Sequence, residues 1–375
     1  LALFSKMVQV LASKKSKSGS ILKLMEQNLL LIVTVVGVVG GFYLVLNASR
    51  GESQTIAPDS STGIRSGSGS GSGSSTKDTM RLGLFTASAP SILSSGRPYL
   101  IYGTAWKEDE TARLVSQAVK AGFRMIDTAC QPKHYREDLV GEGWSEAAAA
   151  LGIKREDLSL QTKFTSLNGQ DRNSVPYNKR SSLEDQVKQS LSKSLTNLRT
   201  TYLDSLVLHS PMSTHADTMK VWRTFEGFVD EGKVRALGIS NCYDPKKFMK
   251  IYDEARIKPN VLQNRFYAES GFDVELRKFC RDHDIKYQSF WTLSANRKAL
   301  AKPQIKELAQ SKGLTPQTLM YAYMMTNGHT PLDGTTNMNH MNEDITLMKR
   351  IFEGEQIFDD KEMALIDRIL GIPDE

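Results

Sequence analysis

Short apolar segments alternate with longer amphipathic segments from about residue 97 to the end of the chain. The short segments have the length and composition of buried strands, and the longer ones carry apolar residues at helical spacing. The predicted strands are Tyr99–Gly103, Arg124–Asp127, Leu158–Lys163, Leu203–His209, Ala236–Ser240, Asn260–Arg265, Lys286–Phe290 and Thr330–Thr335. Helical patterns lie between them, such as Asp109–Ala121, Leu183–Leu198, Thr218–Glu231, Val274–His283 and Thr315–Thr326. Eight strands separated by helices predict an α/β fold in which residues 97–375 form one (β/α)₈, or TIM, barrel.

Residues 1–50 have a different character, because a Lys- and Ser-rich stretch leads into an uncharged apolar run at Leu29–Leu46. A helix of this length would span about 27 Å, close to the roughly 30 Å of a bilayer core. The run predicts a single transmembrane helix at about 29–46. Lysines precede the run and few positive charges follow it, which predicts a type II orientation with the barrel on the non-cytosolic side.

Residues 51–96 are expected to be a flexible, disordered linker and lead-in, since glycine and serine alternate from Ser66 to Ser75. A second interpretation is that residues 1–78 do not belong to the native protein. The barrel would then be a cytoplasmic enzyme without a membrane partner.

The charge distribution argues against nucleic-acid binding, and the cysteine spacing argues against a disulfide-rich or metal-binding protein. Residues 1–78 carry eight Lys or Arg and four Asp or Glu, whereas the remaining residues carry 40 and 38. The near-neutral main domain therefore lacks the basic surface that binds nucleic acid. Cys130, Cys242 and Cys280 are far apart in the sequence, which argues against a disulfide framework or a metal site.

Polar residues stand where the predicted strands end. Asp127 ends the second strand, Lys163 the third and His209 the fourth, while Ser240 and Asn241 follow the fifth. In a TIM barrel the carboxyl ends of all strands meet at one face, and active sites lie there. Buried charges also need partners, so these side chains are expected to form one catalytic site.

The segments around these residues resemble the aldo-keto reductases from Tyr99 to the end of the chain. The matching segments, in order, are YGTAWK, GFRMIDTA, YREDLVG, QTKF, LVLHSP, GKVRALGISN and VLQN. The resemblance implies a catalytic tetrad of Asp127, Tyr135, Lys163 and His209. One departure concerns Tyr135: seven residues, TACQPKH, separate it from Asp127, whereas the family usually has four.

Such a tetrad suits the reduction of an aldehyde or ketone by NAD(P)H, or the reverse reaction. Hydride transfer to a carbonyl carbon leaves an alkoxide, which Tyr135 would protonate. The ammonium of Lys163 is expected to lower the pKa of that phenol, with Asp127 holding Lys163 in place. His209 would bond the carbonyl oxygen and orient the substrate.

The resemblance also implies a cofactor site and a substrate pocket. The matching cofactor positions are Ser240, Asn241 and Gln263 for the carboxamide, Phe290 for stacking on nicotinamide, and Gly334, Thr335, His340, Glu343 and Asp344 for the adenosine phosphate. The resemblance implies that NADP(H) is the preferred cofactor and that NAD(H) is possible. Gly334 and His340 stand where the family usually has lysine and arginine, which weakens the inference of NADP(H) over NAD(H). Trp106 and Trp291 are expected to line the pocket of a small carbonyl substrate.

A competing interpretation is a nucleotide-binding regulatory subunit without significant catalysis, like the potassium-channel β-subunits that share this barrel. Those subunits tend to lose the histidine at the position of His209. Its presence beside Asp127 and Lys163 therefore favours an enzyme.

Overall fold

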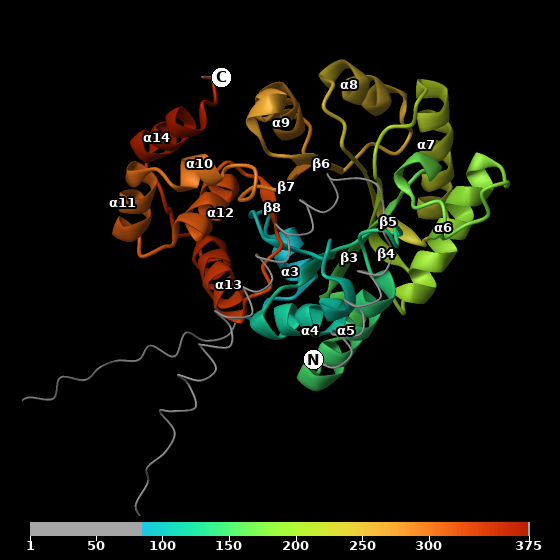
Figure 1. Ribbon diagram of the computed structural model, residues 1–375, viewed down its shortest axis with the longest axis horizontal. Helices are drawn as coiled ribbons and strands as arrows, with labels where there is room; N and C mark the ends of the chain where they lie inside the picture. The colour runs from blue at the N-terminus through green and yellow to red at the C-terminus, as the bar shows by residue number, and fades with distance from the viewer. Residues whose placement is uncertain (1–84, 374–375) are drawn as a thin grey trace, which may run out of the picture. The chain divides into compact units, whose positions relative to one another are not determined.

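The computed structural model describes residues 85–373 and contains the predicted barrel. Eight strands of this part are parallel and close on one another in chain order, with β8 pairing back onto β1. They are β1 Ile101–Gly103, β2 Met125–Asp127, β3 Ser159–Phe164, β4 Leu203–Leu208, β5 Val234–Ser240, β6 Val261–Arg265, β7 Lys286–Phe290 and β8 Thr330–Asp333. Each predicted strand is present, with ends that differ by at most two residues from those expected. Figure 1 shows the helices arranged around the strands.

The helices between strands agree with the predicted amphipathic segments. Those that follow the strands are α4 Thr111–Ala121, α5 Glu137–Leu151, α6 Leu183–Asn197, α7 His215–Asp230, α8 Pro245–Glu254, α9 Val274–Asp282, α12 Pro316–Thr326 and α13 Met338–Phe352. Shorter or terminal elements are α3 Ala89–Ser94, α10 Arg297–Leu300, α11 Pro303–Ser311, α14 Asp360–Leu370, and the 3₁₀ turns η1 Glu108–Glu110, η2 Arg155–Asp157, η3 Leu167–Gly169 and η4 Ala268–Asp273.

Local sequence explains where several helices begin. Thr214 before α7, Asp244 before α8 and Thr315 before α12 each accept a hydrogen bond from a backbone N–H of the first turn. This N-cap contact satisfies a donor that has no partner within the helix. Helices α7 and α8 therefore start within seven residues of the ends of β4 and β5, which keeps these two loops short, whereas longer segments lead from β3 to α6 and from β7 to α12.

Helix α5 packs closely on both neighbouring helices because of two glycines. A Cβ atom at Gly141 would lie 2.0 Å from the carbonyl oxygen of Asn197, and one at Gly143 would lie 2.3 Å from that of Ala112. Neither distance is sterically possible, so only glycine allows α5 to approach α4 and the end of α6 this closely.

The lead-in before residue 97 is more ordered than its composition predicts. Helix α3 begins after the N-cap Ser88, and its Ala89 and Ile92 are buried together with Phe85. Residues 85–96 of the expected lead-in thus pack against the barrel, whereas the rest of the expected linker lies outside the described residues. The predicted transmembrane segment, Leu29–Leu46, lies outside the described residues. Within 85–373, the helices are too short or too polar to cross a bilayer.

Candidate active site

A buried ion pair lies where β2 and β3 end. Lys163 Nζ is 2.6 Å from Asp127 Oδ2 and also donates to the carbonyl oxygen of Thr128 at 2.8 Å. Asp127 is 2% exposed and Lys163 is 1% exposed, so the two charges are held away from water. A buried pair of this kind is tolerated because each charge has both its counter-charge and hydrogen bonds.

Two glutamines inside the barrel hold the other oxygen of Asp127, and a third glutamine bridges them. Gln161 Nε2 and Gln263 Nε2 donate to Asp127 Oδ1 at 2.7 and 3.0 Å. Both also donate to Gln288 Oε1, at 2.7 and 2.9 Å. The Asp127 carboxylate thus accepts hydrogen bonds on both oxygens, which fixes its orientation. Gln161 and Gln288 were not among the predicted site residues, although Gln161 lies two positions before Lys163 and so shares its face of β3.

The longer loop after β2 brings Tyr135 back to this ion pair. Its backbone is held by hydrogen bonds from Cys130 N to the Lys163 carbonyl oxygen at 3.0 Å and from Tyr135 N to that of Gln131 at 3.1 Å. The ring of His134 in this loop packs on Trp106, with 3.7 Å between centroids, and is half-buried. The three extra residues are therefore accommodated without displacing Tyr135 from the site.

Tyr135 lies close to both the ion pair and His209. Its ring centroid is 5.3 Å from Lys163 Nζ and 6.1 Å from the His209 ring, which it meets edge to face. Burial raises the pKa of the Tyr135 phenol above its ordinary value, and the negative charge of Asp127 adds to that rise. The direction is opposite to the expected lowering by Lys163, because burial and the negative charge of Asp127 both disfavour the phenolate. In this state Tyr135 keeps its proton.

His209 follows β4 and is held from two sides. Its Nδ1 lies 2.6 Å from Thr165 Oγ1, and its carbonyl oxygen accepts a hydrogen bond from Asn241 Nδ2 at 2.8 Å. Burial lowers the pKa of His209 to about 3, and the nearby charge of Lys163 contributes. The imidazole is therefore neutral near pH 7, and it can act as a hydrogen-bond donor rather than as a cation.

A cavity of about 210 Å³ is lined by Asp127, Tyr135 and His209, with Lys163 paired to Asp127 behind them. The other predicted site residues in its wall are Trp106, Ser240, Asn241, Gln263, Phe290 and Trp291. The Ser240 hydroxyl donates to the carbonyl oxygen of Gln263 at 2.7 Å. The structure thus brings the predicted tetrad and the predicted nicotinamide contacts to one place.

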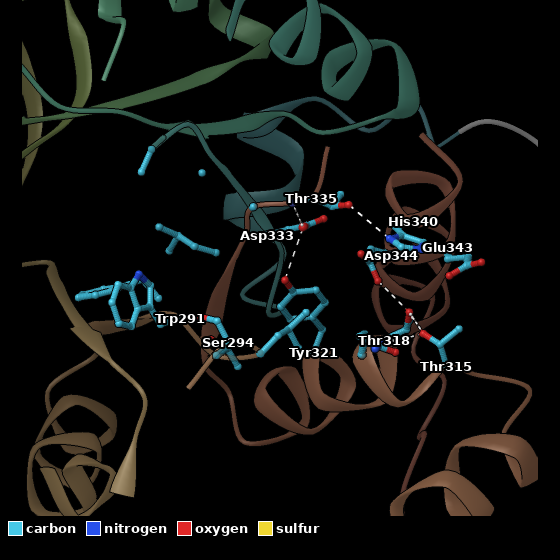
Figure 2. A pocket seen from close by; sticks show the side chains of 18 of the residues that line it. Trp291, Ser294, Thr315, Thr318, Tyr321, Asp333, Thr335, His340, Glu343 and Asp344 are labelled. Carbon is cyan, nitrogen blue, oxygen red and sulfur yellow. Dashed lines mark hydrogen bonds between the residues drawn. The ribbon is translucent and has the colours of Figure 1, made fainter. Parts of the chain in front are cut away.

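A second cavity, of about 470 Å³, continues from the first and shares Trp106, Phe290 and Trp291 with it. Its wall includes the predicted adenosine-side residues Gly334, Thr335, His340, Glu343 and Asp344. Figure 2 shows the last three along α13, with Trp291 across the pocket. Thr335 Oγ1 lies 3.5 Å from His340 Nδ1.

Two buried carboxyl groups, Asp333 and Asp344, line this second cavity. Burial raises the pKa of Asp344 to about 9, and the neighbouring Asp333 adds to the rise. Lys107 donates from Nζ to the carbonyl oxygen of Gly334 at 2.8 Å, and burial lowers its pKa to about 8. Lys107 belongs to the YGTAWK segment, but the resemblance does not identify it as a site residue.

Three residues that line the two cavities have left-handed backbone conformations. Trp106, Asn241 and Trp291 have φ angles of 62°, 52° and 55°. The left-handed region is sterically unfavourable for residues other than glycine, and such residues are concentrated at functional sites. Here the unusual backbone coincides with exposed indoles, since Trp106 is 63% and Trp291 51% exposed.

Comparison with known proteins agrees with this geometry. Residues 99–370 match the model of the Aldo/keto reductase family. The chain is 29% identical over 250 residues to D-galacturonate reductase of Hypocrea jecorina, which covers 60% of this chain and 74% of that protein. It is 27% identical over 270 residues to the 9,11-endoperoxide prostaglandin H2 reductase of Trypanosoma cruzi, and the match covers 71% of this chain and 86% of that protein. A Bombyx mori aldo-keto reductase solved with NADP superposes with a TM-score of 0.59 and 22% identity, covering 72% of this chain and 88% of that one.

The family match spans well over half of the chain and includes every strand of the barrel. It also includes the residues that line both cavities. The chain therefore belongs to the aldo/keto reductase family, and it is an NAD(P)H-dependent oxidoreductase that acts on carbonyl groups.

Proposed function

We propose that Tyr135 donates the proton when this protein reduces an aldehyde or ketone to the alcohol, and accepts it in the reverse reaction. The observation that supports this assignment is the placement of Tyr135 beside the buried Asp127–Lys163 pair, in the wall of the cavity that His209 also lines. The phenol retains its proton there, as a general acid must before it acts.

The two joined cavities fit an elongated dinucleotide. The smaller one carries the amide and hydroxyl groups of Ser240, Asn241 and Gln263, and the larger one ends at α13. When bound, the reduced nicotinamide supplies the hydride. We assign Phe290 to the nicotinamide ring, and Thr335, His340 and Glu343 to the adenosine end.

Each residue of the tetrad then has a separate task. His209 orients the carbonyl oxygen and stabilises the charge that develops on it. Tyr135 delivers its proton to that oxygen, and Lys163 stabilises the phenolate that remains. Asp127 keeps the lysine charged and oriented in a site with little water, while the glutamines keep Asp127 itself in place.

The regulatory-subunit alternative is not favoured. His209 is present and lies in the wall of the same cavity as Tyr135. The relatives described above are named as reductases.

Product analysis tests the proposed reaction. The full chain, a reduced nicotinamide cofactor and a panel of aldehydes and ketones should yield the matching alcohols, in amounts equal to the cofactor oxidised. Cofactor binding without alcohol formation across the panel would instead favour the regulatory alternative.

We further propose that NADP(H) is the preferred cofactor, that NAD(H) is also used, and that the discrimination between them is weak. Gly334 and His340 stand where a cationic pair is expected at the phosphate. The Gly334→Lys/His340→Arg double variant should therefore tighten NADPH binding at least about tenfold while leaving NADH nearly unchanged, because each charge-assisted bond contributes roughly 1.5–3 kcal/mol. Dissociation constants for both cofactors, measured by fluorescence titration, provide the comparison.

The structure leaves room for this change. A Cβ atom at Gly334 would meet nothing within 4 Å, and His340 is exposed. Asn342→Arg is the matched control, since it adds a cation to an exposed position of α13 that does not line the cavity. Equal tightening of both cofactors would mean that the phosphate does not lie beside residues 334 and 340.

We also propose that Leu29–Leu46 anchors the barrel to a membrane, on the basis of its length and lack of charge. After alkaline carbonate extraction of expressing cells, the full-length chain should stay in the pellet, whereas a chain starting at Thr79 should be released. Release of the full-length chain would contradict the anchor and favour the interpretation of a cytoplasmic enzyme.

A further inference from the structure

We propose that Thr165 is a positioning residue that decides which nitrogen of His209 carries the ring proton. In this arrangement the Thr165 hydroxyl donates to Nδ1, and Nε2–H is left to donate a hydrogen bond to the substrate oxygen. The inference deepens the role given to His209 above and therefore rests on the proposed function.

The direction of the Thr165–His209 hydrogen bond follows from the number of partners available. Thr165 is 4% exposed, and its Oγ1 lies 2.6 Å from His209 Nδ1. Within residues 85–373, this is the one hydrogen bond that the structure gives to Oγ1. If Nδ1–H were the donor, the hydroxyl proton of Thr165 would lack a protein acceptor among the described residues. The free-energy cost of burying an unpaired donor exceeds the stabilisation from one hydrogen bond. We therefore infer that the hydroxyl donates and that Nδ1 accepts.

The side chain of Thr165 is held so that only its hydroxyl faces His209. A Cβ atom at Gly169, in η3, would lie 2.7 Å from Thr165 Cγ2, so the methyl group packs directly against Gly169. The carbonyl oxygen of Thr165 accepts hydrogen bonds from Tyr177 Oη at 2.7 Å and from Gln170 Nε2 at 3.2 Å. The loop after β3 thus fixes both the backbone and the rotamer of Thr165.

The position of the ring proton matters because His209 carries only one. Its pKa is lowered to about 3, so the ring is neutral during catalysis near pH 7. With the proton on Nδ1, Nε2 would present a lone pair to the carbonyl oxygen and repel it. With the proton on Nε2, the ring donates a hydrogen bond that strengthens as the alkoxide develops.

The first test is the ring-nitrogen NMR spectrum of the full chain labelled with ¹⁵N-histidine, with His209 assigned by comparison with His209→Gln. We expect Nδ1 to show the shift of an unprotonated nitrogen that accepts a hydrogen bond, and Nε2 the shift of a protonated nitrogen. A protonated Nδ1 in the unsubstituted protein would overturn the proposal, whatever the activity.

Variants of Thr165 and Gly169 give the second test. Thr165→Val keeps the shape but removes the hydroxyl, so the Nδ1 resonance should shift and kcat/KM should fall about tenfold. Thr165→Ser should restore both. Gly169→Ala keeps the hydroxyl but forces Thr165 to rotate, and it should reproduce the effect of Thr165→Val. Cofactor affinity should not change in any of them. Unchanged spectra and kcat in both Thr165→Val and Gly169→Ala would contradict the proposal.

Two further variants separate this inference from the proposed reaction. Thr224→Val, in α7, makes the same chemical change at a residue that does not line the cavity and should leave kcat and the His209 spectrum unchanged. His209→Gln tests the role of His209 itself. If His209→Gln is fully active, the role of the histidine fails. If it is impaired while Thr165→Val is not, only the positioning role of Thr165 fails.

Discussion

Replacing Tyr135 with phenylalanine is expected to lower kcat for carbonyl reduction by about 10²–10⁴-fold, the usual contribution of a general acid. The phenol is the proton source that the site presents beside the Asp127–Lys163 pair, and phenylalanine keeps its ring but not its proton. Cofactor binding should be nearly unchanged, because the hydroxyl acts on the substrate oxygen alone. The measurement is the steady-state rate of cofactor oxidation together with a separate titration of cofactor affinity.

Tyr202→Phe is the matched control for this variant. Tyr202 precedes β4 at the opposite end of the barrel, and its buried hydroxyl has no hydrogen-bond partner among the described residues. Removing that hydroxyl should not affect kcat. Tyr177 is less suitable as a control, because its hydroxyl bonds the backbone of Thr165. If Tyr135→Phe retains most of its activity, Tyr135 is not the proton donor, and another group must supply the proton. His209 and His134 are then the next candidates.

Replacing Lys163 with methionine should be as damaging to turnover and should also lower stability. The variant removes the charge that stabilises the phenolate of Tyr135. It also leaves the Asp127 carboxylate buried without a counter-charge, which typically costs about 3–5 kcal/mol. We expect kcat to fall by about 10²-fold or more, and chemical denaturation to show the loss in the free energy of unfolding.

A double variant separates the two effects of Lys163→Met. Lys163→Met/Asp127→Asn removes both charges, and the amide oxygen of asparagine can still accept hydrogen bonds from Gln161 and Gln263. Stability should recover at least in part, since no unpaired charge remains. Activity should remain low. If activity returned with stability, Lys163 would be structural rather than catalytic.

The barrel and the strand-end residues could be predicted because both depend on local patterns. Strand periodicity fixes which side chains share a face, and parallel strands bring their carboxyl ends together. Asp127, Lys163 and His209 therefore converge in the structure as expected. Tyr135 is brought to them despite the longer loop, because that loop is tied by backbone hydrogen bonds to β3.

Other parts of the site depend on tertiary contacts that no local pattern reveals. Gln288 lies 127 residues from Gln161, and nothing in either strand marks the pair as partners. In the sequence, nothing distinguishes Thr165 from other loop residues, because its partner His209 lies 44 positions later in the chain. The sequence predicts a lowered pKa for Tyr135, whereas burial and the charge of Asp127 raise it in the structure. The sequence does not predict helix α3, because the helix has few apolar residues and serine and glycine are frequent in and around it.

The most direct test of the proposed chemistry is the transfer of deuterium from reduced cofactor labelled at nicotinamide C4. The full chain, with the labelled cofactor and a carbonyl substrate found active in the panel, should produce an alcohol that carries deuterium on the carbinol carbon. The Tyr135→Phe variant should form the same labelled product far more slowly. The cofactor is labelled on one face of the ring in one reaction and on the other face in a second reaction. If the alcohol carries no deuterium in either reaction, hydride transfer from the nicotinamide is contradicted, and with it the assignment of this site.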